Sequence, residues 1–433
     1  MKIIHQHLCQ QLSITNMNTP LYIAKKMSEE HQQGSRVVRI SSTIVTGSVA
    51  LSISVIIIAL SIVSGFRKEV RERAVGFTGQ IIITPFGVDY MNDSYPLSLE
   101  LSYLHMIPNL DNVSHTQYFA FRHGLIKTDE AMQGVVIKGV GKEFDKSFFD
   151  SCLLQGAFPQ WNDSVPSLEL LISKRMSEAL KLDVHQVVTL FFIDSNLSTA
   201  LPRRFTVSGI YDAALEEFDK SLAIGDIRVV QRLNGWTPMQ VGGIELLLHH
   251  SRQMERTARE IDEIAARYAT KDDSSILVRT VKERFAHLFD WLNLLDMNLL
   301  IVLILMIAVA GVNMISGLLI MLFDKTAMIG LLKSLGMKNR EIRLTFIYRM
   351  GNLILRGIFI GNTIAVILCL IQKKYAVITL DQINYAVSSI PINMNVRSIC
   401  LINVISFMLI LALMLLASMM VTRISPERSL RVK

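Results

Sequence analysis

Residues 40–66 read ISSTIVTGSVALSISVIIIALSIVSGF, a run of 27 residues that contains no charged side chain. A helix needs about 20 predominantly apolar residues to cross the hydrocarbon core of a bilayer. Two further charge-free runs exceed this length, at residues 297–323 and 398–422. Buried helices of soluble domains are rarely uncharged over such lengths, so the pattern predicts that these three segments span a membrane.

A fourth candidate span lies at residues 346–371, where two arginines interrupt the apolar pattern. Arg349 is close enough to the start of the run for its side chain to snorkel to a membrane interface. Arg356 lies one or two turns deeper, and we expect it to face protein, lipid headgroups or water. The sequence therefore predicts an α-helical membrane protein with four spans.

The composition fits a membrane protein with a sizeable soluble part. The chain has 433 residues, of which 51% are hydrophobic and 19% are charged; soluble domains contain about 25% charged residues. The net charge of +7 comes from basic residues beside the apolar runs, which the positive-inside effect explains without a nucleic-acid partner. The four cysteines are widely spaced, and their spacing predicts neither a disulfide framework nor a metal site.

The spacing of the four runs sets the domain organisation. About 230 residues separate the first two spans, whereas the later loops are short. Lys and Arg in short loops and tails face the cytoplasm, which places both termini there and the large segment outside. The predicted order is a cytoplasmic segment (1–39), span one (40–66), outer stalks with a mixed α/β domain (67–296), span two (297–323), a cytoplasmic loop (324–345), span three (346–371), an outer loop (372–397), span four (398–422) and a cytoplasmic tail (423–433).

The outer segment reads as mixed α and β. Runs rich in β-branched and aromatic residues predict strands at 79–86, 134–141, 187–193 and 203–211. A strand–helix–strand unit follows at 242–250, 252–269 and 274–281, with Met254, Ala258, Ile261, Ile264 and Ala265 on one helical face.

A narrow apolar seam precedes the second span. Two alternatives explain it: a helix that rests on its own domain, or a stalk that pairs with a helical continuation past Phe66. The seam residues recur at spacings of four and three: Val281, Phe285, Leu288, Leu292 and Leu295.

Motifs for catalysis are missing from the sequence. No GxxxxGK[ST] loop occurs to cradle ATP phosphates, and neither HExxH nor GxSxG is present. The pair His249–His250 is better explained as a solvated loop entrance than as a ligand pair. The acidic cluster Glu216, Glu217 and Asp219 fits a polar surface or structural hairpin better than acid–base chemistry. We therefore expect a non-catalytic protein that transduces motion.

The loop after the second span carries IGLLKSLGMKNREIR at residues 329–343. Ile329, Leu332 and Leu335, with Leu331 alongside, give a short helix an apolar face, and Gly336 can end that helix at the C′ position. The residues alone leave two alternatives open: an interfacial anchor helix, or a knob that inserts into a partner.

Several segments resemble one family. KTAMIGLLKSLGMKNREIRLTF (325–346) resembles the cytoplasmic loop of FtsX/MacB-type permeases of ABC transporters. Its lipoprotein-releasing, LolC/LolE-like branch is similar to segments spread over nearly the whole chain: LYIAKKM (21–27), SGFRKEVRERAVGFTGQIIITP (64–85), GIYDAALEEFDKSLAIGDIRVVQRL (209–233) and VTRISPERSLR (421–431). One departure is Met328, which stands where the family commonly has Glu; docking would then depend more on apolar packing and Lys333.

The resemblance implies a permease subunit of the inner membrane with a MacB-like periplasmic domain. It would bind no cofactor, because ATP and Mg would be held by a separate ATPase subunit in two copies. Its other partners would be a second permease protomer, identical or paralogous, membrane lipid, a lipoprotein substrate and a periplasmic chaperone. The segment Glu217, Phe218 and Asp219 could contact a partner. The coupling helix would comprise Ile329, Gly330, Leu332, Lys333, Ser334, Leu335, Gly336 and Met337.

Two other functions within this superfamily stay open at this point. One is a MacB-like exporter of a periplasmic substrate, which would require a periplasmic adaptor. The other is an FtsX-like signalling subunit that activates a cell-wall hydrolase. We also expect residues 1–16 to be an over-long start or a leader, because Met17 opens a more natural beginning.

Overall fold

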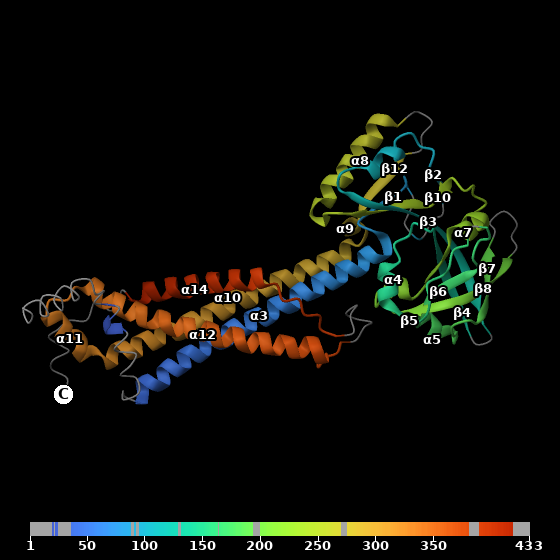
Figure 1. Ribbon diagram of the computed structural model, residues 1–433. Helices are drawn as coiled ribbons and strands as arrows, with labels where there is room; N and C mark the ends of the chain where they lie inside the picture. The colour runs from blue at the N-terminus through green and yellow to red at the C-terminus, as the bar shows by residue number, and fades with distance from the viewer. Residues whose placement is uncertain are drawn as a thin grey trace, which may run out of the picture. The chain divides into compact units, whose positions relative to one another are not determined.

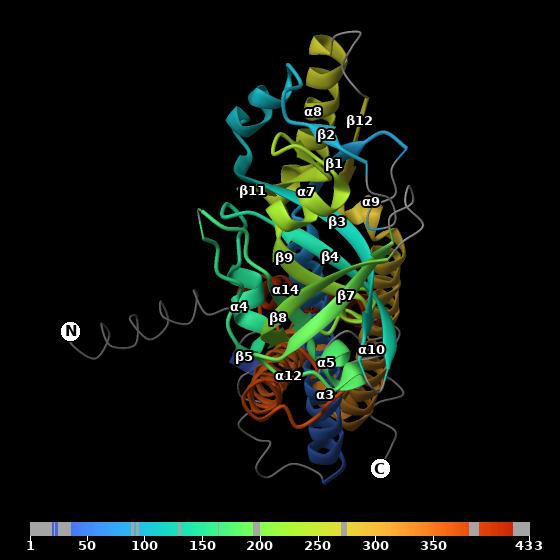
Figure 2. The same cartoon turned by 90° about the vertical axis from the view of Figure 1, so that its right-hand side faces the viewer.

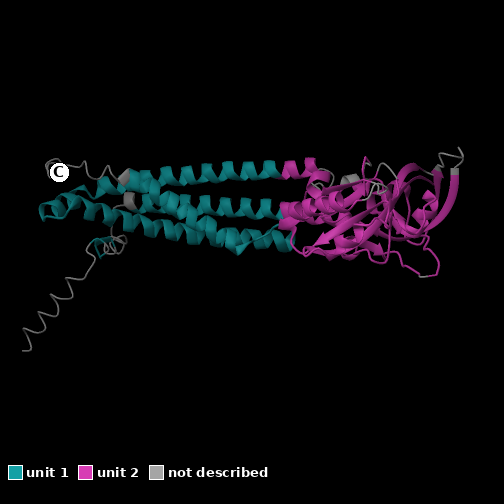
Figure 3. Cartoon of the chain, turned by 90° about the horizontal axis from the view of Figure 1, so that it is seen from above, with its two compact units in different colours: residues 1–66, 293–378, 390–433 teal, residues 67–292, 379–389 magenta. Residues whose placement is uncertain are grey.

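The chain forms two compact units, which Figure 3 colours separately. The first, called the membrane unit below, comprises residues 1–66, 293–378 and 390–433, and the second, called the outer unit, comprises residues 67–292 and 379–389. The predicted leader and C-terminal tail lie outside the residues that the structure describes. This computed structural model describes residues 20, 22–24, 36–87, 91, 95–128, 131–162, 164–193, 200–269, 275–380 and 389–418.

Four helices of the described chain are long and apolar enough to cross a membrane, which confirms the four predicted spans. Three of them, α3, α10 and α12, have 43, 39 and 37 residues and are much longer than a bilayer requires. Both α3 and α10, which Figure 1 labels, contain residues of the two units: Phe66 is the last residue of α3 in the membrane unit, and Asn293 is the first residue of α10 in it. The four are α3 (Arg36–Thr78), α10 (Ala286–Asp324), α12 (Asn339–Tyr375) and α14 (Val396–Ser418).

Glycines let two of these helices approach closely within the membrane unit. Gly357 and Gly361 lie four residues apart on α12 and face α3. A Cβ atom added at Gly361 would lie 2.6 Å from the carbonyl oxygen of Ala50, and one at Gly357 would lie 2.8 Å from the Cβ of Val49. Small residues with this spacing are typical of helix contacts in membranes, where close backbone approach maximises van der Waals contact.

Polar side chains also join the membrane helices. The amide of Asn313 on α10 donates to Ser48 Oγ on α3 at 2.9 Å. Asn362 on α12 and Asn403 on α14 exchange amide hydrogen bonds of 3.2 and 3.0 Å. Such pairs satisfy polar groups that would otherwise face hydrocarbon.

Arg349 differs from the prediction that it snorkels to an interface. Its side chain is only 2% exposed in the membrane unit. Because α12 begins at Asn339, Arg349 lies well inside the helix, on the face that also buries Ile342, Phe346 and Leu353. The helical period therefore turns this arginine inward.

The outer unit is built on a mixed sheet, which within the described residues has ten strands. Neighbouring strands follow the order β12-β1-β11-β3-β4-β9-β6-β8-β5, and β7 pairs with both β3 and β8. Figure 2 labels β3, β4 and β9 of this sheet. The pairs β4–β9 and β6–β8 are parallel, and the other named pairs are antiparallel. The strands are β1 (Ile81–Pro85), β3 (Val113–Lys127), β4 (Met132–Val140), β5 (Leu153–Gly156), β6 (Glu169–Ser173), β7 (Val187–Ile193), β8 (Ala200–Tyr211), β9 (Leu222–Asp226), β11 (Gly243–Leu248) and β12 (Ile276–Thr280); β2 (Leu97–Ser98) and β10 (Gln240–Val241) form a separate pair.

The strands predicted at 79–86, 134–141, 187–193 and 203–211 are present as β1, β4, β7 and β8. The predicted strand–helix–strand unit is β11, α8 (Met254–Tyr268) and β12, with β1 hydrogen-bonded between the two strands. The shorter elements are η2 (Leu104–Asn109), α4 (Ser147–Cys152), α5 (Lys174–Leu180), α6 (Glu216–Asp219), α7 (Ile227–Asn234), η3 (Ser251–Gln253), α9 (Val281–Arg284) and α11 (Thr326–Ser334).

Candidate functional site

The short helix α11 ends in a Schellman motif. Gly336 adopts a left-handed conformation with φ of 90°, as the C′ position of this motif requires. The N–H of Gly336 donates to the carbonyl of Lys333 at 3.1 Å, and the N–H of Met337 donates to the carbonyl of Leu332 at 3.0 Å. The predicted helix end at Gly336 is therefore confirmed, and a side chain there would strain the turn.

The apolar residues of α11 fall on two opposite sides. Ile329 is completely buried in the core of the membrane unit, and Leu332 and Met337 pack against the same core. Leu331 and Leu335, four residues apart, are 58% and 75% exposed. Since residues at i and i+4 share one helical face, these two leucines form an exposed apolar edge.

The predicted residues of this helix therefore have different environments. Ile329 and Gly330 face inward, Leu332, Lys333 and Met337 are half-buried, and Ser334, Leu335 and Gly336 are exposed. Leu331 was not among the predicted site residues. Apolar periodicity found the helix, but it did not distinguish the side that the chain covers from the side that it leaves open.

The turn after α11 leads directly into α12. Lys338 is the N-cap of α12, and its backbone N–H donates to the carboxylate of Glu341 at 3.1 Å. Glu341 also places a negative charge in the first turn of α12, where the helix dipole favours it. The two helices are therefore joined by a short connection that is fixed at both ends.

In the outer unit, three aromatic rings join the continuations of α3 and α10. Phe218 stacks on Phe77 at the end of α3, with ring centroids 4.2 Å apart and planes 8° apart. Phe218 also meets the edge of Phe285, which lies between α9 and α10, at 5.7 Å. Val281, Phe285 and Leu288 belong to, or pack on, the core of the outer unit. At this end the seam therefore rests on its own domain, and Phe218 links it to α3.

The predicted partner segment is largely internal. Phe218 and Asp219 are buried, so their side chains serve the core of the outer unit and not a contact surface. The side chain of Glu217 lies outside what the structure describes. Burial, followed by repulsion from Asp212, raises the pKa of Asp219 to about 7. One carboxylate oxygen of Asp219 accepts the N–H of Leu215 at 3.1 Å.

A buried ion pair holds the end of α3. Lys138 on β4 and Glu245 on β11 are both essentially inaccessible, and Lys138 Nζ lies 2.7 and 3.0 Å from the two carboxylate oxygens. Lys138 also donates to the carbonyl of Phe77 in the last turn of α3. Gln117 donates to the same carboxylate at 2.8 Å. Burial lowers the pKa of Lys138 against the opposing effect of Glu245.

We call this arrangement the α3 anchor (Phe77, Lys138 and Glu245). The sequence pattern did not lead us to predict it. The signal was present: each charge stands alone in an apolar strand, within GVVIKGVG and GGIELLLHH. Unpaired charges are rarely buried, so two lone charges of opposite sign in two strands indicate a buried pair. A lysine that caps the last carbonyls of a helix also complements its dipole.

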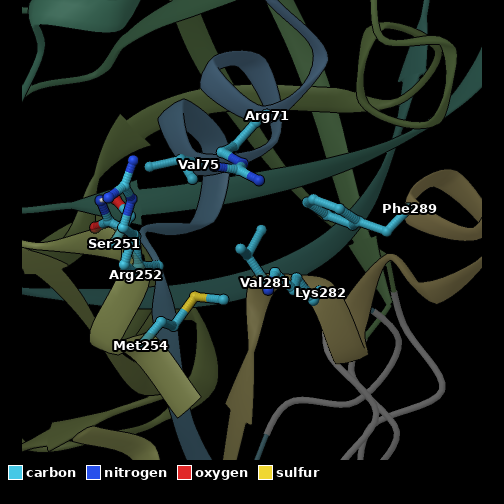
Figure 4. Close-up of a pocket in the computed structure, with 9 residues that line it drawn as sticks. Arg71, Val75, Ser251, Arg252, Met254, Val281, Lys282 and Phe289 are labelled. Carbon is cyan, nitrogen blue, oxygen red and sulfur yellow. Dashed lines mark hydrogen bonds between the residues drawn. The ribbon is translucent and has the colours of Figure 1, made fainter. Parts of the chain in front are cut away.

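A small pocket lies beside the α3 continuation in the outer unit (Figure 4). Its volume is about 220 Å³, and Arg71, Met254 and Phe289 surround the same hollow. Pockets that bind small molecules usually have at least about 300 Å³. Lys282, on its rim, pairs with Glu255 at 2.5 Å, and this hydrogen bond lowers the pKa of Glu255. The hollow is therefore too small for lipid acyl chains.

The histidine pair His249 and His250 was predicted to be a solvated loop entrance. Both side chains are exposed just after β11, as a solvated loop entrance requires. Across the described residues, no three His, Cys, Asp or Glu side chains gather as metal ligands.

Two family models match the chain. The model of the MacB-like periplasmic core domain matches residues 42–264, just over half of the 433 residues. The model of the FtsX-like permease C-terminal region matches residues 300–426. The chain belongs to the FtsX/MacB-type permease family. Permeases of this family are non-catalytic membrane components of ABC transporters that bind no cofactor, so this permease acts with an ATPase partner.

Similar proteins cover most of this permease. It is 24% identical over 401 residues to "Lipoprotein-releasing system transmembrane protein LolC" of Xylella fastidiosa (strain 9a5c), which covers 88% of this chain and 92% of that protein. LolE of Haemophilus influenzae (strain ATCC 51907 / DSM 11121 / KW20 / Rd) is 24% identical over 362 residues, covering 82% and 83%. A crystal structure of the periplasmic region of MacB from Actinobacillus actinomycetemcomitans aligns with 48% of this chain and 92% of that one, with a TM-score of 0.33 and 11% identity.

Proposed function

We propose that this permease couples ATP hydrolysis by its ATPase partner to the release of lipoproteins from the inner membrane toward a periplasmic carrier. The observation that carries the proposal is the similarity to proteins named as lipoprotein-releasing over 88% of the chain. This similarity extends through both units and is not confined to the domain types that FtsX/MacB-type permeases share.

The energetics of the substrate agree with an ATP-driven machine. Each buried CH₂ group of an acyl chain holds a lipoprotein in the bilayer by about 0.8 kcal/mol. Several acyl chains together cost far more than thermal energy supplies, so release needs an external source. The chain has no phosphate-binding loop of its own, and the partner supplies that energy.

We assign the docking of the ATPase to the edge formed by Leu331 and Leu335. An amphipathic helix that inserts into a groove presents apolar anchors at such i, i+4 positions. Lys333 lies between them in the sequence but projects from another side of the helix, where it is half-buried. Ile329, Leu332 and Met337 attach the opposite side of α11 to the core of the membrane unit. A push on the exposed edge is therefore transmitted to packed helices.

The α3 anchor supports a relay into the outer unit. Helix α3 is continuous from Arg36 to Thr78, and its last turn is fixed by Lys138 and by the stack of Phe77 on Phe218. A displacement of α3 along or about its axis then reaches the sheet of the outer unit directly. The buried pair Lys138–Glu245 prevents this end of the helix from fraying.

The proposed assembly contains two copies of the ATPase and a second permease protomer, identical or paralogous. Both termini and residues 324–345 face the cytoplasm, and residues 67–296 face the periplasm, where a soluble chaperone accepts the lipoprotein. The excess of Lys and Arg in the short loop supports this orientation.

Depletion of the permease in cells tests the function. We expect lipoproteins destined for the outer membrane to accumulate in the inner membrane, as fractionation and immunoblotting would show. Normal sorting after depletion would exclude the proposal. Co-purification with a periplasmic adaptor would support a MacB-like exporter, and co-purification with a cell-wall hydrolase would support an FtsX-like signalling subunit.

A further inference from the structure

A groove opens between α3 and α12 on the surface of the membrane unit, with a volume of about 780 Å³. It lies within one unit and is distinct from both α11 and the outer unit. The floor is where the glycines of α12 bring the two helices together, as the contact of Gly357 with Thr46 and Val49 indicates. Its lining side chains come from both helices.

The polar lining residues of α3 gather at one end of the groove, where Leu353 and Leu355 of α12 also line it. Arg39 and the hydroxyl residues Ser42 and Thr43 lie at the N-terminal end of α3. Phe359 and Ile360 lie further along α12. The helices run in the same direction, because Gly357 meets Thr46 and Gly361 meets Ala50. The polar end is therefore the N-terminal side of the groove on both helices.

The charged side chain of Arg356 lies in an apolar segment and needs an anionic partner. It is exposed on α12 and lines the groove, inside an apolar segment. No carboxylate of the described chain forms an ion pair with it. Arg39, at the start of the apolar run of α3, lines the same groove.

A second copy of this chain cannot neutralise Arg356 from within its own spans. Residues 40–66, 297–323, 346–371 and 398–422 contain no Asp or Glu. The anion that is abundant at the boundary of the hydrocarbon core is the phosphate of a phospholipid. Guanidinium groups bind phosphate oxygens through paired, charge-assisted hydrogen bonds.

We propose that this groove binds one phospholipid with an anionic headgroup. Arg356 binds its phosphate, and its acyl chains lie along Phe359 and Ile360. The hydroxyls of Ser42 and Thr43 already donate to the carbonyl of Arg39, so the donor to the lipid is the guanidinium of Arg356. The bound lipid completes the α3–α12 contact on its membrane-facing side.

Native mass spectrometry tests this site. The full-length permease is released from bilayers that contain equal amounts of phosphatidylglycerol and phosphatidylcholine, and retained lipid is counted for each variant. The positive charge of Arg356 in an otherwise apolar stretch of the groove should enrich phosphatidylglycerol, whose headgroup carries a net negative charge, in the wild-type protein. Arg356→Gln should lower the ratio of retained phosphatidylglycerol to phosphatidylcholine about tenfold, because it removes one charge-assisted contact.

Two further variants keep the test decisive. Lys373→Gln removes one cation from the far end of the same helix and should retain the wild-type ratio. Gly47→Leu fills the groove without changing charge, and a Cβ atom there meets nothing within 4 Å. Because leucine also favours a helix over glycine, Gly47→Leu should fold and should lose the lipid.

The outcomes separate the possible occupants. Loss of the lipid from Arg356→Gln and Gly47→Leu, with retention by Lys373→Gln, supports the site. Equal retention by all variants overturns it. A change in the mass of the assembly with unchanged lipid assigns the groove to a protein partner and also overturns it. Displacement of the lipid by free inorganic phosphate would show a site for phosphate alone.

Discussion

Substitution of Lys138 by Met tests the α3 anchor. The change leaves the carboxylate of Glu245 buried without its cation and leaves the carbonyl of Phe77 without its donor. Removal of one partner from a buried ion pair typically costs 3–5 kcal/mol, so we take about 4 kcal/mol for Lys138→Met. For a unit of this size, about 1 kcal/mol corresponds to a shift of 2–4 °C in the melting midpoint. The midpoint of the outer unit should therefore fall by roughly 10 °C.

The assay is thermal unfolding of the purified full-length permease, followed by tryptophan fluorescence. Trp161 and Trp236 both report on the outer unit. The matched control is the double variant Lys138→Met with Glu245→Gln, in which no buried charge is left, and it should recover most of the lost stability. A midpoint for Lys138→Met within about 2 °C of wild type would refute the reasoning. The reasoning would also be refuted if the double variant lost as much stability as the single variants Lys138→Met and Glu245→Gln lose together.

Three further predictions concern the two units separately. Asp219→Asn should abolish a pH dependence. The folded pKa of Asp219, about 7, lies above the ordinary pKa of an aspartate. As the pH rises from about 4 to about 7, wild-type stability should therefore fall by at most about 4 kcal/mol, and it should stay level at higher pH. Melting midpoints across this range measure it, and parallel curves for both proteins would contradict the assignment. Phe218→Ala should lower the unfolding free energy of the outer unit by about 3–5 kcal/mol in denaturant titrations. A decrease below about 1 kcal/mol would mean that the contacts among Phe77, Phe218 and Phe285 are dispensable. Gly361→Ile should separate α3 from α12, because its Cβ would lie 2.6 Å from the carbonyl oxygen of Ala50; unchanged disulfide cross-linking between cysteines placed on these helices would argue against close packing.

The sequence was most informative where one physical constraint dominates. Charge-free runs longer than a bilayer predicted the four spans because hydrocarbon excludes charged side chains. Strands with short β-branched runs were also found. The longest strand, β3, was missed because His115, Gln117 and Arg122 interrupt its apolar pattern. Its position in the middle of the sheet, set by pairing with β11 and β4, decides its conformation.

The candidate site was only partly predictable, for a similar reason. The letters Glu-Glu-Phe-Asp suggest a polar surface, yet Phe218 stacks on Phe77, a residue far away in the sequence. Likewise, the period of α11 identifies its apolar residues, but only packing shows that Ile329 faces inward and Leu335 outward. Local patterns indicate which residues are apolar, and tertiary contacts determine which of them are left to meet a partner.

Reconstituted lipoprotein release measures the central claim most directly. The permease and its ATPase partner are placed in liposomes with a labelled lipoprotein, and ATP and the soluble carrier are added. The account predicts ATP-dependent transfer of lipoprotein to the carrier by wild type. It predicts background transfer and no stimulated ATP hydrolysis by Leu335→Asp, with the variant still inserted in the membrane. Transfer by Leu335→Asp at the wild-type rate, or no transfer by wild type, would contradict the account.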